Sequence, residues 1–273
     1  MAFDCYGTLI DFGDGAYTRA YERICSEQGL PLSGDVFYEK WMEIWRRLVS
    51  DGRVAATTDA VPGPNQPGPL SETVTIPAHP LHHASGSRAR PINGPLPVFR
   101  TYREEWTEHF ALCFEELGVK GDAAAGHEHL RAMLADAPAF AEARRTIETV
   151  GRRLPIAVMS NADDDFLYPV LAKNALTFPV VMSSEEARAY KPHEAIFQRL
   201  SDAMGVAPEK ILYVGDSRVA DVTGSKNAGM HAAWVNRGSD NKGASNWAGP
   251  QRDMVEPDVE VSRLDGLLDF LGL

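Results

Sequence analysis

The chain has 273 residues, of which 44% are hydrophobic and 24% are charged, as is typical of a globular protein with a sizeable core. Its formal net charge of −11 argues against nucleic acid as a partner, because phosphate backbones bind basic faces. The chain has no apolar run as long as a membrane span, no basic leader and no paired spacing of its three cysteines, so we expect a cytoplasmic protein with reduced thiols and no membrane partner.

The first stretch of the chain, residues 3–11, reads Phe-Asp-Cys-Tyr-Gly-Thr-Leu-Ile-Asp. Its apolar start is typical of the end of a buried strand, and Gly7 lets the backbone turn just after that strand. Open α/β sheets bind ligands at the carboxyl edge of their strands. Asp4 is therefore a candidate nucleophile, and Thr8 is a candidate for orienting a substrate oxygen. An Asp at this position could also simply cap a turn.

Helical patterns follow this first stretch as far as residue 138. Residues 54–97 interrupt them, since they are rich in proline and glycine and show no apolar periodicity. Such a segment buries too little to offset its ordering entropy, so we predict a long solvated loop or a disordered insertion there. Apolar residues recur at three- and four-residue steps, as in amphipathic helices, over residues 17–28, 35–51, 102–117 and 123–134.

From residue 139 onward, helical patterns alternate with short apolar runs that are typical of buried strands. This alternation predicts a parallel sheet with helices on both faces. An irregular stretch and a closing helix over residues 264–271 are expected at the end of the chain. The expected strands cover residues 155–159, 180–182, 211–214 and 232–235.

Polar residues that follow the expected strands should meet at one edge of that sheet. Ser160 offers a hydroxyl, and Asn161 stands where the next helix presents free backbone N–H groups that can bind an anion. Lys191 brings a positive charge, and Asp216 and Asp221 stand five residues apart after a strand. Taken singly, each has a structural interpretation as a helix cap, a surface lysine or a first-turn acid.

In this order and spacing, the residues resemble the four motifs of the haloacid dehalogenase superfamily, whose nucleophilic Asp opens an Asp-x-x-Gly-Thr-Leu pattern. The resemblance implies an α/β fold, with a Rossmann-like catalytic core of a parallel sheet flanked by helices over residues 1–11 and 139–273. It also implies a helical cap domain over residues 12–138, inserted after the first strand and closing over the active site.

The resemblance also implies roles for these residues and a small-molecule substrate. Asp4 would attack the substrate and form an aspartyl-enzyme intermediate. Thr8, Ser160 and Lys191 would assist it, and Asn161 would help to bind the substrate. The oligomeric state and the substrate's identity do not follow from the sequence.

The acidic residues of these motifs predict a metal cofactor. Asp4, Asp216 and Asp221 bring three negative charges against one from Lys191, which leaves about −2 in a small site. Each like-charge pair ~4 Å apart costs about 4 kcal/mol at an effective dielectric near 20. Such a cluster favours a divalent cation, and its all-oxygen ligands suit Mg²⁺. By resemblance to the phosphatases of the superfamily, the ligands are Asp4, the backbone carbonyl of Tyr6 and Asp216, with Asp221 close by.

The side chain of Tyr6 favours a different reaction. Most phosphatases of the superfamily carry a second Asp at this position as general acid, whereas Tyr6 resembles the 2-haloacid dehalogenase branch. That branch also places an Arg that binds the substrate carboxylate after a Trp in the second helix, and Trp45-Arg46 is similar. Tyr6 and Arg46 are therefore candidate substrate-binding residues.

Three hypotheses remain open. The leading one is a hydrolase that removes phosphate from a small phosphorylated metabolite with Mg²⁺. The second is a 2-haloacid dehalogenase, in which Asp4 displaces halide without a metal and without a proton donor. The third is a non-catalytic binding module that kept the fold and lost turnover.

Overall fold

The computed structural model describes residues 1–50, 93–238 and 255–273 of the chain. Within these residues the strands form one parallel sheet in the order β3-β2-β1-β4-β5-β6, which confirms the predicted Rossmann-like α/β core. The first strand lies near the middle of the sheet, so the chain adds strands on both sides of it. The strands are β1 (Ala2–Phe3), β2 (Ala157–Ser160), β3 (Val180–Ser183), β4 (Leu212–Gly215), β5 (His231–Val235) and β6 (Val259–Val261).

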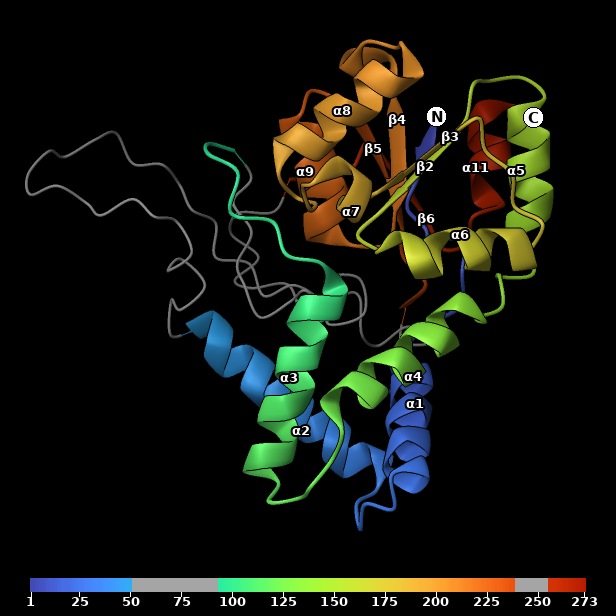
Figure 1. Ribbon diagram of the computed structural model, residues 1–273. Coiled ribbons are helices and arrows are strands. Elements are labelled where there is room, and N and C mark those ends of the chain that lie inside the picture. Colours follow the sequence, from blue (N-terminus) through green and yellow to red (C-terminus); the bar gives the residue numbers. More distant parts are fainter. Residues whose placement is uncertain (51–92, 239–254) are drawn as a thin grey trace, which may run out of the picture.

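Side chains alternate across the central strands and give the sheet two buried faces. Ala2 pairs in register with Tyr213, and both pack into the apolar cluster beneath α8 (Glu194–Met204). Phe3 pairs with Val214, and both belong to the larger cluster on the opposite face. Figure 1 shows α8 and α9 (Gly224–Asn227) on one side of the strands, with helices α5 (Ala143–Gly151) and α11 (Gly266–Leu271) on the other.

Helix α6 (Asp164–Lys173) follows β2 and packs into the larger cluster, and the short helix α7 (Ser184–Ala187) follows β3. A short helix, η1 (Pro208–Lys210), precedes β4. After β4 the chain forms a six-residue π-helix, η2 (Arg218–Thr223), and continues as α9. Such π-turns are rare and often stand at functional sites.

One part of the predicted core is wrong. The stretch expected to be irregular before the closing helix contains β6, which pairs with β5 at the edge of the sheet. Only three residues form this strand, and one of them, Glu260, is charged and exposed. A segment of that length is too short to display a period of two in the sequence, so only the backbone pairing reveals it.

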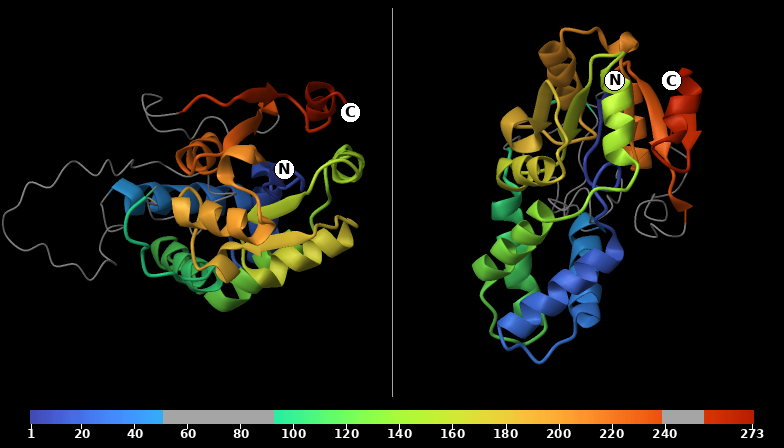
Figure 2. Two further views of the ribbon diagram at one scale, coloured as in Figure 1. Left: turned by 90° about the horizontal axis from the view of Figure 1, so that it is seen from above. Right: turned by 90° about the vertical axis from the view of Figure 1, so that its right-hand side faces the viewer.

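The predicted helical unit between β1 and α5 is present in the described residues. Figures 1 and 2 show its helices gathered to one side of the sheet. Aromatic side chains of its second helix lie in the core of this helical unit, where Trp41 stacks on His109 with ring centroids 3.8 Å apart and Phe37 lies against Phe110. The helices are α1 (Asp14–Glu27), α2 (Gly34–Ser50), α3 (Tyr102–Glu116) and α4 (Ala123–Ala135).

Two connections between the sheet and this helical unit run side by side. Asp11 N–H donates to Pro138 O at 2.8 Å, and Phe140 N–H donates to Leu9 O at 2.9 Å. These bonds lie beside the domain boundaries predicted at residues 11 and 138. Residues 51–92, most of the insertion predicted at 54–97, lie outside the described residues. None of the described helices is both long and apolar enough to cross a membrane.

Candidate active site

The turn after β1 holds Asp4 at the carboxyl edge of the sheet. Asp4 N–H donates to Val214 O at 2.8 Å, which continues the pairing of β1 with β4. The backbone then turns back, with Leu9 N–H donating to Cys5 O at 2.8 Å. Gly7 lies in the turn with φ +84°. Residues other than glycine adopt this backbone conformation only with strain. The Gly of the motif is therefore explained by backbone geometry.

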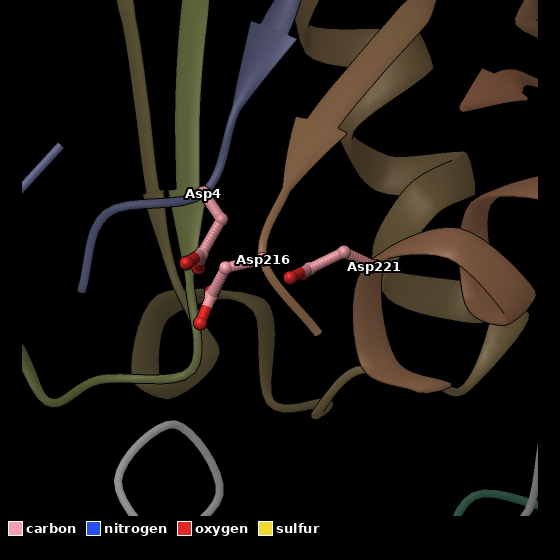
Figure 3. Close-up of side chains that lie close together, drawn as sticks. All are labelled: Asp4, Asp216 and Asp221. Atoms are coloured by element: carbon pink, nitrogen blue, oxygen red, sulfur yellow. The ribbon is translucent and has the colours of Figure 1, made fainter. Parts of the chain in front are cut away.

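Three carboxylates meet at this edge, as predicted from the spacing. Asp4 follows β1, Asp216 follows β4, and Asp221 lies in η2. Figure 3 shows the three side chains converging beyond the ends of the strands. All three are buried, and one oxygen from each lies within 4.8 Å of the others. Three carboxylate oxygens at this separation are a donor set that suits a hard divalent cation.

Close packing explains the glycine that precedes Asp216. A Cβ atom added to Gly215 would lie 2.2 Å from the Cγ atom of Asp221. Asp221 in turn accepts a hydrogen bond through Oδ2 from Ser217 N–H at 2.9 Å, and Ser217 Oγ accepts one from Ala220 N–H at 3.1 Å. The Gly-Asp-Ser-x-x-x-Asp pattern therefore brings Asp221 back against the end of β4.

Lys191 provides the positive charge at the centre of the cluster. Its ammonium donates to Asp4 Oδ1 and to Asp221 Oδ1, both at 2.6 Å, and to the hydroxyl of Tyr213 at 3.1 Å. Tyr213 donates its own hydroxyl proton to Met159 O at 2.8 Å. All three proton-donating directions of the ammonium are thus used, which fixes its position between two carboxylates.

Asn161 holds the backbone beside this ammonium. Its side-chain oxygen accepts from Lys191 N–H at 2.8 Å, and its side-chain nitrogen donates to Lys191 O at 3.1 Å. Two hydroxyls complete the surroundings of the nucleophile. Thr8 Oγ1 lies 3.3 Å from Asp4 Oδ2 and 3.4 Å from Asp216 Oδ1, and Ser160 Oγ donates to Asp4 Oδ1 at 3.4 Å. The structure therefore brings these predicted residues together around Asp4.

The crowding of charges perturbs the titration of the site. Burial raises the pKa of Asp4 to about 6, with Lys191 opposing the shift and Asp221 adding to it. Burial, then the charges of Asp4 and Asp221, raises the pKa of Asp216 well above the usual range. Burial alone would lower the pKa of Lys191, but Asp221 and Asp4 raise it, so the ammonium stays charged. The surroundings of Asp216 therefore favour its neutral form over its charged form.

Two predicted substrate-binding residues, Tyr6 and Arg46, are not among the described side chains that surround Asp4. The hydroxyl of Tyr6 is directed away from the carboxylates, and lies 3.3 Å from Leu134 O in α4 and 3.2 Å from Phe166 O in α6. Burial raises the pKa of that phenol well above its usual range. Arg46 lies in α2, and its side chain falls outside the described part of the chain.

Tyr213 is a site residue that sequence reasoning missed. It lies in β4 among aliphatic neighbours, where it reads as one more apolar strand residue. A signal was nevertheless present, because a buried Tyr hydroxyl needs a hydrogen-bond partner. A Tyr in a buried parallel strand one residue before Val214-Gly215-Asp216 indicates a polar group close to the site.

Comparisons with known proteins agree with this geometry. A family model described as haloacid dehalogenase-like hydrolase matches residues 1–229. Phosphoglycolate phosphatase of Escherichia coli (strain K12) is 30% identical over 122 residues, 44% of this chain and 45% of that protein. Haloacetate dehalogenase H-2 of Moraxella sp. (strain B) is 34% identical over 101 residues, 36% of this chain and 45% of that protein. The chain thus matches less than half of the length of either relative.

The chain also resembles solved structures in its fold. The L-2-haloacid dehalogenase from Xanthobacter autotrophicus superimposes with a TM-score of 0.67 at 19% sequence identity. The superposition covers 99% of this chain and 97% of that protein. At this identity the likeness concerns the fold, including the helical unit, and leaves the reaction open.

Proposed function

The chain belongs to the family of haloacid dehalogenase-like hydrolases, and we propose that it is a Mg²⁺-dependent phosphatase acting on a small phosphorylated metabolite. One observation carries the proposal: three buried carboxylates present oxygens within 4.8 Å of one another, and the ammonium of Lys191 lies between two of them. Among relatives at least 30% identical over part of the chain, a phosphoglycolate phosphatase supports the same reaction class.

The donor set fits Mg²⁺. Asp4, Asp216 and the backbone carbonyl of Tyr6 would hold the ion, with Asp221 in support, and all of these are hard oxygen donors. A bound Mg²⁺ would supply positive charge to the phosphoryl oxygens of the substrate. Its binding would also favour the ionised form of Asp216, whose pKa the neighbouring carboxylates raise, so that uptake of the ion releases a proton.

The reaction proceeds through the side chain of Asp4. A carboxylate oxygen of Asp4 forms a bond to phosphorus while the bond from phosphorus to the leaving oxygen breaks, and that oxygen departs with the electron pair. Water then attacks phosphorus, inorganic phosphate leaves, and the carboxylate of Asp4 is restored. Lys191, Ser160 and Thr8 contact the two Asp4 oxygens and keep the carboxylate oriented through both steps.

The leaving oxygen must take up a proton from another source than residue 6. The phenol of Tyr6 faces the carbonyls of Leu134 and Phe166, and its raised pKa makes it a poor acid. Loss of general acid catalysis typically costs a factor of about 10²–10⁴ in rate. We therefore propose that the enzyme works on esters whose leaving group needs little protonation, with water as the proton donor.

Tyr6 also favours a second candidate function, dehalogenation of a 2-haloacid. There Asp4 would attack the carbon that carries the halogen, and halide would leave with the electron pair and without a proton. The absence of an acid at residue 6 would then not slow the reaction. The haloacetate dehalogenase among the relatives supports this alternative.

Two assays on the same preparation separate the candidates. Release of inorganic phosphate from a panel that includes phosphoglycolate and p-nitrophenyl phosphate is measured with Mg²⁺ and with chelator, and release of chloride from 2-chloropropionate is measured under both conditions. We expect phosphate release only with Mg²⁺, and its fall below about 1% in Asp4→Asn, which removes the nucleophile. Chloride release that persists in chelator would establish the dehalogenase. No turnover in either assay would favour a binding module.

A further inference from the structure

Arg237 contacts the turn that carries Asp4, although it lies outside the four motifs. It follows β5 by two residues, and its side chain is only 10% exposed. Its Nε–H donates to Gly7 O at 3.2 Å, and its Nη2–H donates to Thr8 O at 3.0 Å. One guanidinium therefore binds two successive carbonyls of the turn.

The guanidinium is itself held from the other side. Its Nη1 lies 2.8 Å from Oε1 of Glu142, whose side chain is 6% exposed, and its carbon atom lies 3.5 Å above the ring of Phe140. Phe140 N–H donates to Leu9 O in the same turn. A buried Arg with a paired carboxylate and a stacked ring has little freedom to move, so it fixes what it binds.

The position of these bonds matters for Thr8. The carbonyls of Gly7 and Thr8 belong to the two peptide planes on either side of the Thr8 Cα atom. Because a peptide group is planar, holding both carbonyls fixes both backbone dihedrals of Thr8 and the direction of its Cβ atom. Its hydroxyl lies 3.3 Å from Asp4 and 3.4 Å from Asp216, so its placement depends on that backbone.

We propose that Arg237 is a positioning residue for the nucleophile turn: it holds the peptide groups on both sides of Thr8 and thereby places the Thr8 hydroxyl between Asp4 and Asp216. The kinetic part of this inference rests on the proposed function, since it requires turnover at Asp4. It is the same for phosphate transfer and for halide displacement, because both use that turn.

The alternative is a purely structural Arg that ties β5 to the segment before α5. Two substitutions distinguish the roles. Arg237→Lys keeps a positive charge for Glu142 but has no planar fork that can bind two carbonyls at once. Arg263→Lys is the matched control: Arg263 contacts the same Glu142 at 3.4 Å, is 58% exposed, and has no described bond to the turn.

The test combines kinetics with amide hydrogen exchange, and the exchange needs no substrate. For Arg237→Lys we expect kcat to fall about 10²-fold, as for a displaced catalytic group, with KM changed less than about threefold. Peptides covering residues 5–10 should exchange at least about tenfold faster, while peptides of α8 keep their wild-type rates. Arg263→Lys should match the wild type in every measurement.

Wild-type exchange in residues 5–10 of Arg237→Lys would overturn the proposal, and so would faster exchange shared equally by α8, which indicates a general loss of stability. If Arg237→Lys does not fold, Glu142→Gln is measured in its place. In that variant we expect the amides of residues 5–10 to exchange at least about threefold faster, while the exchange rates of α8 stay unchanged. Wild-type exchange in that variant would refute the inference. A wild type that releases no phosphate refutes the proposed function alone, because the exchange result stands without it.

Discussion

Substitution of Asp216 by Asn tests the metal site most directly. The change keeps the shape of the side chain and removes its charge, and it leaves Lys191 bonded to Asp4 and Asp221 at 2.6 Å each. One oxygen of Asp216 lies within 4.8 Å of an oxygen of each of the other two carboxylates. A cation bound among the three carboxylates would therefore favour the ionised form of Asp216.

The size of the effect follows from charge and linkage. One oxygen of each carboxylate lies within 4.8 Å of the others, so a pair of ionised groups at that limit costs ~3.5 kcal/mol at an effective dielectric near 20. The raised pKa of Asp216 shows that, without a cation, the site favours a neutral side chain at this position, and Asn is neutral. The substitution should therefore change the melting temperature little in chelator.

With Mg²⁺ the two proteins should differ. An ion present at a hundred times its dissociation constant stabilises the folded state by about 2.7 kcal/mol. For a chain of this size that corresponds to a rise of about 5–10 °C in melting temperature. We expect this rise in the wild type and less than about 2 °C in Asp216→Asn. Phosphate release should disappear in the variant together with the thermal shift.

Melting curves of both proteins with Mg²⁺ and with chelator measure the effect, with Asp269→Asn as a control that changes an exposed carboxylate in α11. The affinity for Mg²⁺ should also increase with pH, because binding releases the proton of Asp216. A wild type whose melting temperature ignores Mg²⁺ would refute the reasoning. If it also released chloride in chelator, Tyr6 would be the better guide to the reaction.

Two further outcomes follow from buried polar groups. Tyr213→Phe removes the hydroxyl between Lys191 and Met159 O. It should lower the free energy of unfolding, measured in urea, by about 1–3 kcal/mol. A loss under ~0.5 kcal/mol would count against the contact. Burial, opposed by the N–H groups of Tyr102 and Arg103, raises the pKa of Asp163 to about 7. Since the folded state then binds this proton more tightly, its contribution to stability is complete below about pH 4 and is lost as the pH rises to about 7. Asp163→Asn should flatten that part of the stability curve in chelator, and an unchanged slope would contradict the shift.

The fold and the carboxylate cluster could be predicted because their signals are local. Each strand is a short apolar run, and Asp4, Ser160 and Asp216 stand at or directly after the end of such a run. Parallel strands place their carboxyl ends at one edge, so Asp4, Ser160 and Asp216 had to meet. The exception is β6, whose three residues are too few to display a strand period.

Arg237 and Tyr213 could not be predicted in the same way, because their partners are set by tertiary packing. Arg237 binds residues 7 and 8, about 230 positions earlier in the chain, and nothing near it in the sequence indicates that contact. Tyr213 reads as an apolar strand residue until the hydrogen-bond partners of its hydroxyl, Lys191 and Met159 O, are known. Local patterns show which residues are buried, and only the packed structure shows which buried polar groups meet.

The conflict between Tyr6 and Asp216 has a structural resolution. Residue 6 would serve the site in two ways, through its backbone carbonyl as a metal ligand and through its side chain as an acid. The side chain of Tyr6 packs against Phe12 and Phe166, and its hydroxyl lies near the carbonyls of Leu134 and Phe166, so it joins the sheet to the helical unit. Replacing an acid by Tyr therefore removes a proton donor and adds an apolar contact without requiring loss of the carbonyl. A metal site and a missing acid are compatible on this backbone, which is why the charge of Asp216, more than the identity of residue 6, should decide the reaction.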